Sequence, residues 1–130
     1  MAPDCPHCTV ETVPFAVPPS LREYAPEEAD GATICPRCLR VSPAESGPTN
    51  PDFDAVASFF PSGDAGVATA LLLGLLDSLA LNRRAIETVA AQAERRGADV
   101  LLVVDRLSTT VPDPYVDLDR RLVQLQQLLT

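Results

Sequence analysis

The stretch DCPHCTV, residues 4–10, sets a constraint that the rest of the chain has to satisfy. It places two cysteines three positions apart with a proline directly after the first, and CPRC at residues 35–38 repeats this arrangement after a gap of 26 residues. A two-residue spacer lets both thiolates of a pair point at a single ion, and two such pairs complete a tetrahedron. The spacing therefore predicts a structural zinc site, one ion per chain, with four ligands: Cys5, Cys8, Cys35 and Cys38.

Other uses of the four thiols remain open from the sequence. A thioredoxin-like redox motif has one CxxC at the start of a helix, and Pro6 and Pro14 argue against that context. Disulfides are favoured in secreted proteins, whereas the N-terminus shows neither the basic nor the apolar region of a secretory signal. We therefore expect a cytoplasmic protein whose paired cysteines bind a metal, with redox, disulfide and incidental thiols as the alternatives.

The chain offers little for catalysis. Four thiolates fill a tetrahedral zinc shell and leave no open position. His7, the only histidine, lies between two ligands and is expected to point to solvent, although it is also the alternative to a cysteine as ligand. Asp77 is expected to be an exposed or N–H-bonded carboxylate, with a buried carboxylate of raised pKa as the alternative. Without a histidine base or a glycine-rich phosphate loop, we predict that the protein is not an enzyme.

Composition changes near residue 44. Residues 1–43 hold all four cysteines and eight of the 13 prolines, a density that forbids long helices. β-Branched and aromatic residues predict strands at residues 12–17 and 32–34. Turn-forming residues dominate the segment SPAESGPTNP, within which we place a linker at residues 44–51. The abrupt change predicts two separate cores.

From residue 52 onward, apolar residues recur at helical spacing. Residues 98–107, ADVLLVVDRL, fit a buried strand or a short helix, and the helix is predicted because no second strand follows to pair with it. We expect Asp64, Asp99 and Gly97 at helix ends. The expected helices cover residues 53–60, 65–81, 82–97, 98–107 and a final segment with an apolar stripe of Tyr115, Leu118, Leu122, Leu125 and Leu129.

The charge balance bears on the partner. The chain carries 18 acidic residues against 10 arginines, no lysine, and a net charge of −8 spread over its length. Such a surface normally opposes nucleic acid, although molar salt would weaken that objection. The apolar run at residues 65–76 is too short to span a membrane, which needs about 20 residues. We expect a protein partner, with nucleic acid less favoured and no membrane.

Residues 1–43 resemble the zinc-ribbon class, with CPHC and CPRC as knuckles of the CPxC type common in small archaeal proteins. This resemblance implies the same four cysteine ligands, two from each knuckle. Such knuckles often carry glycine after the second cysteine, where this chain has Thr9 and Leu39. With its acidic, lysine-free composition the chain resembles a haloarchaeal zinc-ribbon family of unknown function; an ordinary acidic protein is the alternative.

Together these features predict an α+β protein with a small zinc ribbon at residues 1–43, a linker at 44–51 and an all-α helical bundle at 52–130. The expected function is that of a non-catalytic zinc-binding protein, acting as a protein-interaction or regulatory module. The alternative is a nucleic-acid-associated, transcription-type ribbon in which Arg37 and Arg40 make the contacts.

Overall fold

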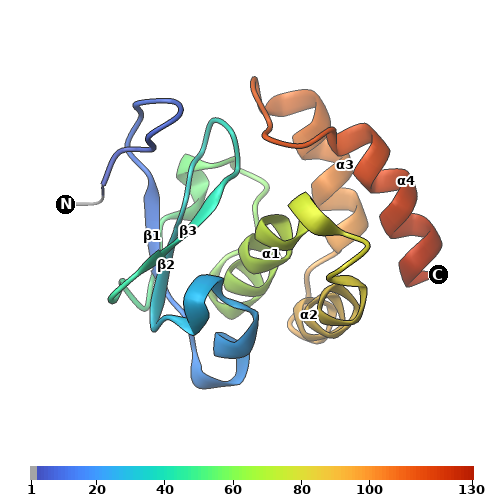
Figure 1. The fold of residues 1–130 in the computed structure, drawn as a ribbon, viewed down its shortest axis with the longest axis horizontal. Coiled ribbons are helices and arrows are strands. Elements are labelled where there is room, and N and C mark those ends of the chain that lie inside the picture. Colours follow the sequence, from blue (N-terminus) through green and yellow to red (C-terminus); the bar gives the residue numbers. More distant parts are fainter. Residues whose placement is uncertain (1–2) are drawn as a thin grey trace.

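The computed structural model describes residues 3–130 and places a small sheet beside four helices (Figure 1). Three antiparallel strands lie in the order β1-β2-β3, with bounds β1 Val13–Ala16, β2 Gly31–Ile34 and β3 Val41–Ala44. The helices are α1 Gly63–Leu75, α2 Arg83–Arg95, α3 Val100–Thr110 and α4 Leu118–Leu129. Short 3-10 helices cover Pro19–Tyr24, Pro26–Glu28, Phe53–Ala55 and Leu76–Ser78. The α+β prediction is confirmed.

The register of the sheet brings the two cysteine pairs to one end. Val13 lies opposite Ile34, which in turn lies opposite Val41, so the segment before β1 and the hairpin between β2 and β3 meet there. Strand β3 was not expected, because its Pro43 and the turn residues after it indicated a linker. A proline is compatible with an edge strand, where the missing N–H need not face another strand.

The helices agree with the sequence in type and differ at their ends. The segment predicted as a helix at residues 98–107 forms α3 from Val100 onward, and the Asp99 carboxylate accepts a hydrogen bond from Leu102 N–H at 3.1 Å as its cap. Gly97 follows α2 with a φ of 96°, as a helix-terminating glycine should. Helix α1 starts one residue earlier than the expected cap, so that Asp64 lies inside its first turn and Ser62 occupies the cap position.

Two expected helical segments are shorter than predicted. The helix expected at residues 53–60 is only the 3-10 helix Phe53–Ala55. The stripe expected to begin at Tyr115 loses this residue to a loop, because the Asp117 carboxylate accepts from Arg120 N–H and starts α4 at Leu118. Because Asp117 is the N-cap, α4 begins at Leu118, three residues later than the apolar stripe suggested.

The sheet and the helices share one hydrophobic core, which differs from the expectation of two. A single cluster of buried residues runs from Val13 in β1 to Leu125 in α4. Helix α1 lies between the sheet and the other helices (Figure 1). A Cβ on Gly74 would lie 2.9 Å from Val41 Cβ, so glycine lets α1 approach β3. The segment after β3 is also held, because Ala16 N–H donates to Pro48 O at 3.0 Å.

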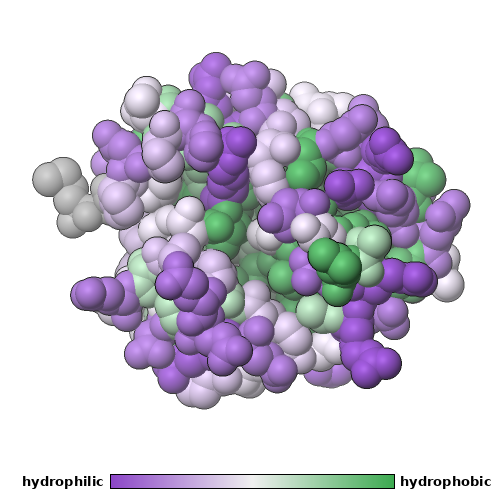
Figure 2. All heavy atoms as spheres, viewed as in Figure 1, coloured by the Kyte–Doolittle hydropathy of each residue, from purple (hydrophilic) through white to green (hydrophobic). Residues whose placement is uncertain are grey.

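The surface is mostly polar. Figure 2 shows hydrophilic residues over most of one face, with hydrophobic residues in separate patches. Among residues 3–130, no helix is both long and apolar enough to cross a membrane.

Candidate metal centre

The first cysteine knuckle is a tight turn closed by backbone hydrogen bonds. Cys5 N–H donates to Val10 O at 2.8 Å, and Thr9 N–H donates to Cys5 O at 2.8 Å. These bonds curl residues 5–8 so that the second cysteine side chain returns toward the first. Thr9 has a φ of 57°, which is the left-handed region that favours glycine.

The second knuckle repeats this geometry. Cys35 N–H donates to Arg40 O at 2.9 Å, and Leu39 N–H donates to Cys35 O at 2.8 Å. Leu39 has a φ of 68°. The residue after each second cysteine therefore takes the backbone conformation of the glycine that such knuckles often carry. The difference in residue type leaves the turn unchanged and adds local backbone strain.

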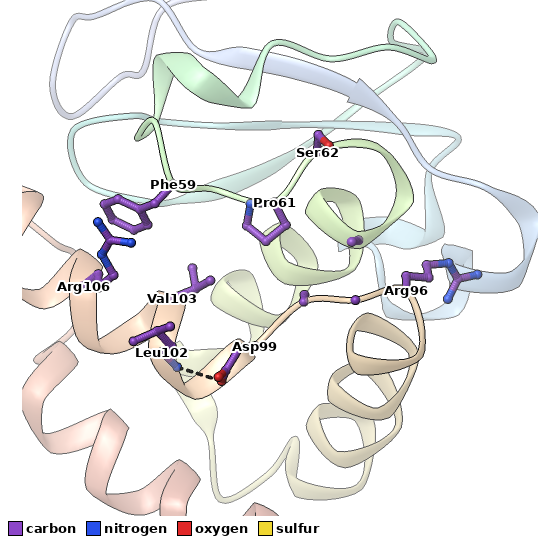
Figure 3. A pocket seen from close by; sticks show the side chains of 11 residues that line it. Phe59, Pro61, Ser62, Arg96, Asp99, Leu102, Val103 and Arg106 are labelled. Atoms are coloured by element: carbon purple, nitrogen blue, oxygen red, sulfur yellow. Dashed lines mark hydrogen bonds between the residues drawn. The ribbon is translucent and has the colours of Figure 1, made fainter.

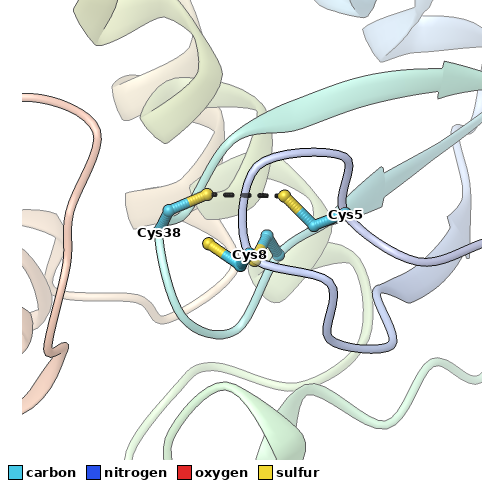
Figure 4. Close-up of side chains that lie close together, drawn as sticks. Cys5, Cys8 and Cys38 are labelled. Atoms are coloured by element: carbon cyan, nitrogen blue, oxygen red, sulfur yellow. Dashed lines mark hydrogen bonds between the residues drawn. The ribbon is translucent and has the colours of Figure 1, made fainter.

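All four predicted cysteines come together. Their Sγ atoms lie within 4.8 Å of one another, and Cys5 Sγ lies 3.8 Å from Cys38 Sγ, where Figure 4 shows the two side chains facing each other. A tetrahedral Zn–S₄ site with bonds of about 2.3 Å places its sulfurs about 3.8 Å apart. The four residues are free thiols, and three of them are at most 3% exposed, with Cys8 half-buried. The donor set thus fits a metal ion.

The thiols differ in how readily they ionise. Burial raises the pKa of the Cys5 thiol, but hydrogen bonds from the backbone of His7 and Cys8 and from neighbouring thiols outweigh it and lower the pKa to about 7. Desolvation and then the sulfurs of Cys38 and Cys35 raise the pKa of Cys8 to about 12. Desolvation is also the main cause of the raised pKa of Cys35. A cation among the sulfurs would relieve this repulsion.

The other residues singled out from the sequence lie outside the cluster. His7 is exposed, as expected, and the potential metal-binding group among the described residues comprises the four cysteines without it. Asp77 is exposed as well. In the second knuckle, Arg37 N–H points at Cys35 Sγ at 3.4 Å, a bond that stabilises a thiolate.

The loop between α3 and α4, residues 111–117, forms a wall of the site that the sequence did not reveal. Tyr115 N–H donates to Cys38 O at 2.9 Å, and Asp113 N–H donates to Arg37 O at 3.3 Å. The Asp113 carboxylate forms an ion pair with Arg37 at 2.8 Å. The sequence placed Tyr115 in the apolar stripe of the final helix, and nothing in its spacing points to a knuckle more than 70 positions away.

Tyr115 connects the cysteine cluster to the main core. Its ring packs against both, and the Arg40 guanidinium lies 5.7 Å from the ring centre. Its hydroxyl donates to Leu73 O in α1 at 2.6 Å. Burial, followed by the charge of Asp77, raises the pKa of this phenol above its usual range. Tyr115 is therefore neutral and serves as a hydrogen-bond donor.

A hollow lies between the segment that precedes α1 and the N-terminal part of helix α3 (Figure 3). Its volume is about 370 Å³. The Arg106 guanidinium lies 4.3 Å from the Phe59 ring centre, Asp99 caps α3, and Arg96 donates to Gln92. These three charged side chains thus have structural partners.

Comparison with known proteins gives one match. The family of unknown function DUF6276 matches residues 4–129. Among the curated proteins and the solved structures, no match was found.

Proposed function

The chain belongs to the DUF6276 family, and we propose that it is a non-catalytic zinc-binding protein of zinc-ribbon type that acts through protein contacts. The observation that carries the proposal is the convergence of four free thiols within 4.8 Å of one another. Within residues 3–130, the four cysteines are the one group of side chains with the geometry of a metal-ligand set.

Zinc is the metal that suits these ligands best. Soft thiolates select zinc, copper(I) or iron–sulfur clusters, and a tetrahedral Cys₄ set on two knuckles is typical of structural zinc. The separation of 3.8 Å between Cys5 Sγ and Cys38 Sγ supports one ion rather than a larger cluster. Four protein ligands close the shell, which supports a structural ion over a catalytic one. A reducing cytoplasm would keep the thiols available.

Elemental analysis of protein purified without added metal tests this assignment. We expect one zinc per chain, and four thiols that react with a thiol reagent only after a chelator is added. Cys35→Ser should lose the zinc, whereas His7→Ala, in the other knuckle and outside the sulfur cluster, should keep it. Freely reactive thiols with little metal in the wild-type protein would contradict the proposal.

The two arginines near the second knuckle favour a protein partner over nucleic acid, because both interact with other residues of the chain. Arg37 is paired with Asp113, and Arg40 lies against the Tyr115 ring, so both serve the packing of the chain. The acidic surface opposes a phosphate backbone. Large apolar side chains are exposed instead on the helical part: Leu81 is 88% exposed, Val123 53% and Leu102 50%.

Two measurements separate these functions. Titration of labelled single- and double-stranded oligonucleotides should show binding no tighter than about 100 µM at physiological salt. Micromolar binding by the zinc-loaded protein would support the nucleic-acid alternative. Capture of partners by the nuclease-treated full chain should weaken in Leu81→Gln and persist in Glu87→Gln, a matched change on exposed surface nearby.

A further inference from the structure

We propose that residues 111–117 form a latch that couples metal occupancy of the cysteine site to the docking of helix α4. The latch deepens the proposed function and rests on it, because it assigns regulation to the same metal site. Asp113 and Tyr115 hold this loop against the second knuckle and α1 through backbone hydrogen bonds, an ion pair and a side-chain hydrogen bond. Figure 1 shows the loop turning back from α3 toward the β2–β3 hairpin.

The first set of contacts fixes the latch to the knuckle itself. Tyr115 N–H and Asp113 N–H both donate to carbonyl oxygens of residues 37–38, and the Asp113 carboxylate is paired with Arg37. Both acceptors lie within the CPRC turn, whose shape a bound metal would hold. Because the acceptors are backbone carbonyls, the hydrogen bonds of the latch depend on the conformation of the turn. Without its metal, the knuckle would change conformation and the two carbonyls would no longer lie in the same positions.

The second set fixes the latch and the first turn of α4 to the end of α1. The Tyr115 hydroxyl donates to Leu73 O at 2.6 Å, and Arg121 Nε in α4 donates to Leu76 O at 2.7 Å. Both carbonyls belong to the C-terminal end of α1 and the 3-10 turn that follows, and Leu73 O accepts the Tyr115 bond in addition to the one from Leu76 N–H. Helix α4 starts directly after the latch, so undocking of the loop would remove the restraint at its N-terminal end.

The coupling works in both directions. If the docked latch favours the metal-bound knuckle, then metal binding favours the docked latch by the same free energy. Groups that hold the metal ligands in place without touching the ion typically change metal affinity 10- to 100-fold. Loss of metal would loosen residues 111–117 and expose the inner face of α4, where Leu118 and Leu125 are buried. The surface offered to a partner would then depend on metal occupancy.

Hydrogen exchange of the full-length protein tests the latch without a mutation. Exchange is compared for the zinc-loaded protein and for protein stripped by a chelator. We expect faster exchange on metal removal at residues 4–10, 35–40, 111–117 and 118–129, with helix α2 still protected. Since α2 lies in the shared core away from the latch, it serves as the internal control.

A matched pair of double variants then tests the contacts. The double variant Asp113→Ala/Tyr115→Ala removes the two side chains that hold the latch. The control, Asp30→Ala/Tyr24→Ala, also removes one aspartate and one tyrosine. Its aspartate belongs to the other Arg–Asp ion pair among the described residues, and its tyrosine is the second one in the sequence. The two pairs have similar exposure, with aspartates 61% and 67% exposed. Transfer of zinc to a colorimetric chelator should be at least about 10-fold faster in the latch variant, and near the wild-type rate in the control.

Several outcomes would overturn the latch. Unchanged α4 protection after metal removal would show that the site and α4 are independent, while zinc binding itself would stand. If α2 and α4 lost their protection from hydrogen exchange together, metal removal would be lowering the stability of the whole protein. Equal zinc release from both double variants would assign the effect to general destabilisation. Failure of the proposed function is distinct, since the wild-type protein would then contain no zinc to remove.

Discussion

Thr9 and Leu39 occupy equivalent positions with the same backbone conformation but different surroundings. Both have a positive φ, which costs a non-glycine residue roughly 1–2 kcal/mol. Thr9 is exposed, whereas Leu39 is 1% exposed within the core. Thr9→Gly should therefore stabilise the zinc-loaded protein by about 1 kcal/mol. Leu39→Gly should destabilise it by about 2 kcal/mol or more, because lost burial exceeds the relieved strain. Denaturant unfolding of both variants checks this, and equal shifts would contradict it.

The unequal thiol pKa values predict proton release on metal binding. The pKa of Cys8 is raised to about 12, that of Cys35 is also raised, and that of Cys5 is lowered to about 7. Near pH 7.5 the thiols of Cys8 and Cys35 are protonated and must ionise to bind zinc, so at least about two protons should leave per ion. Affinity should rise with pH and fall on acidification. Calorimetric titration in buffers of different ionisation enthalpy measures this; a buffer-independent heat would oppose it.

At the scale of elements, α1 ends in carbonyl groups that other elements satisfy. Tyr115 donates to Leu73 O, Asn82 Nδ2 donates to Leu75 O at 3.1 Å, and Arg121 donates to Leu76 O. These side-chain bonds add to the backbone bonding of the helix end, where Leu73 O also accepts from Leu76 N–H. Here they join α1 to the latch, to the start of α2 and to α4.

Arg121→Met tests the contribution of one such bond. The substitution keeps an apolar stem and removes the donor to Leu76 O, so we expect a loss of about 1–2 kcal/mol in the free energy of unfolding. Arg120→Met is the matched control, since Arg120 is exposed on the same helix and should change stability by less than about 0.5 kcal/mol. Comparable losses in both variants would show that the bond contributes little.

At the scale of the whole molecule, charge should make stability depend on salt. The net charge is −8, and two ion pairs occur among the described residues, so most acidic groups repel one another across the surface. Salt screens this repulsion. The melting temperature of the zinc-loaded protein should rise by about 5 °C between dilute buffer and molar KCl, equivalent to about 1 kcal/mol. Glu27→Gln/Glu28→Gln should flatten the rise; a falling curve in the wild-type protein would contradict it.

Local patterns in the sequence determined the ligand candidates and most element types. The repeated CPxC spacing identified the four cysteines that the structure brings together, because a knuckle is a turn defined within a few residues. Helical periodicity and the Asp99 cap identified α3, since capping acts within one turn. Zinc itself and the protein partner stay predictions.

Only the tertiary structure decided the shared core, β3 and the latch. An edge strand containing Pro43 depends on a partner strand to become ordered, and one core for sheet and helices depends on how closely Gly74 lets α1 approach Val41. The Tyr115 hydroxyl and its acceptor on Leu73 lie 42 positions apart. Such contacts depend on where the chain returns in space, which residue spacing does not encode. The cysteine site was thus readable from local sequence, while its connection to α4 exists only in the folded chain.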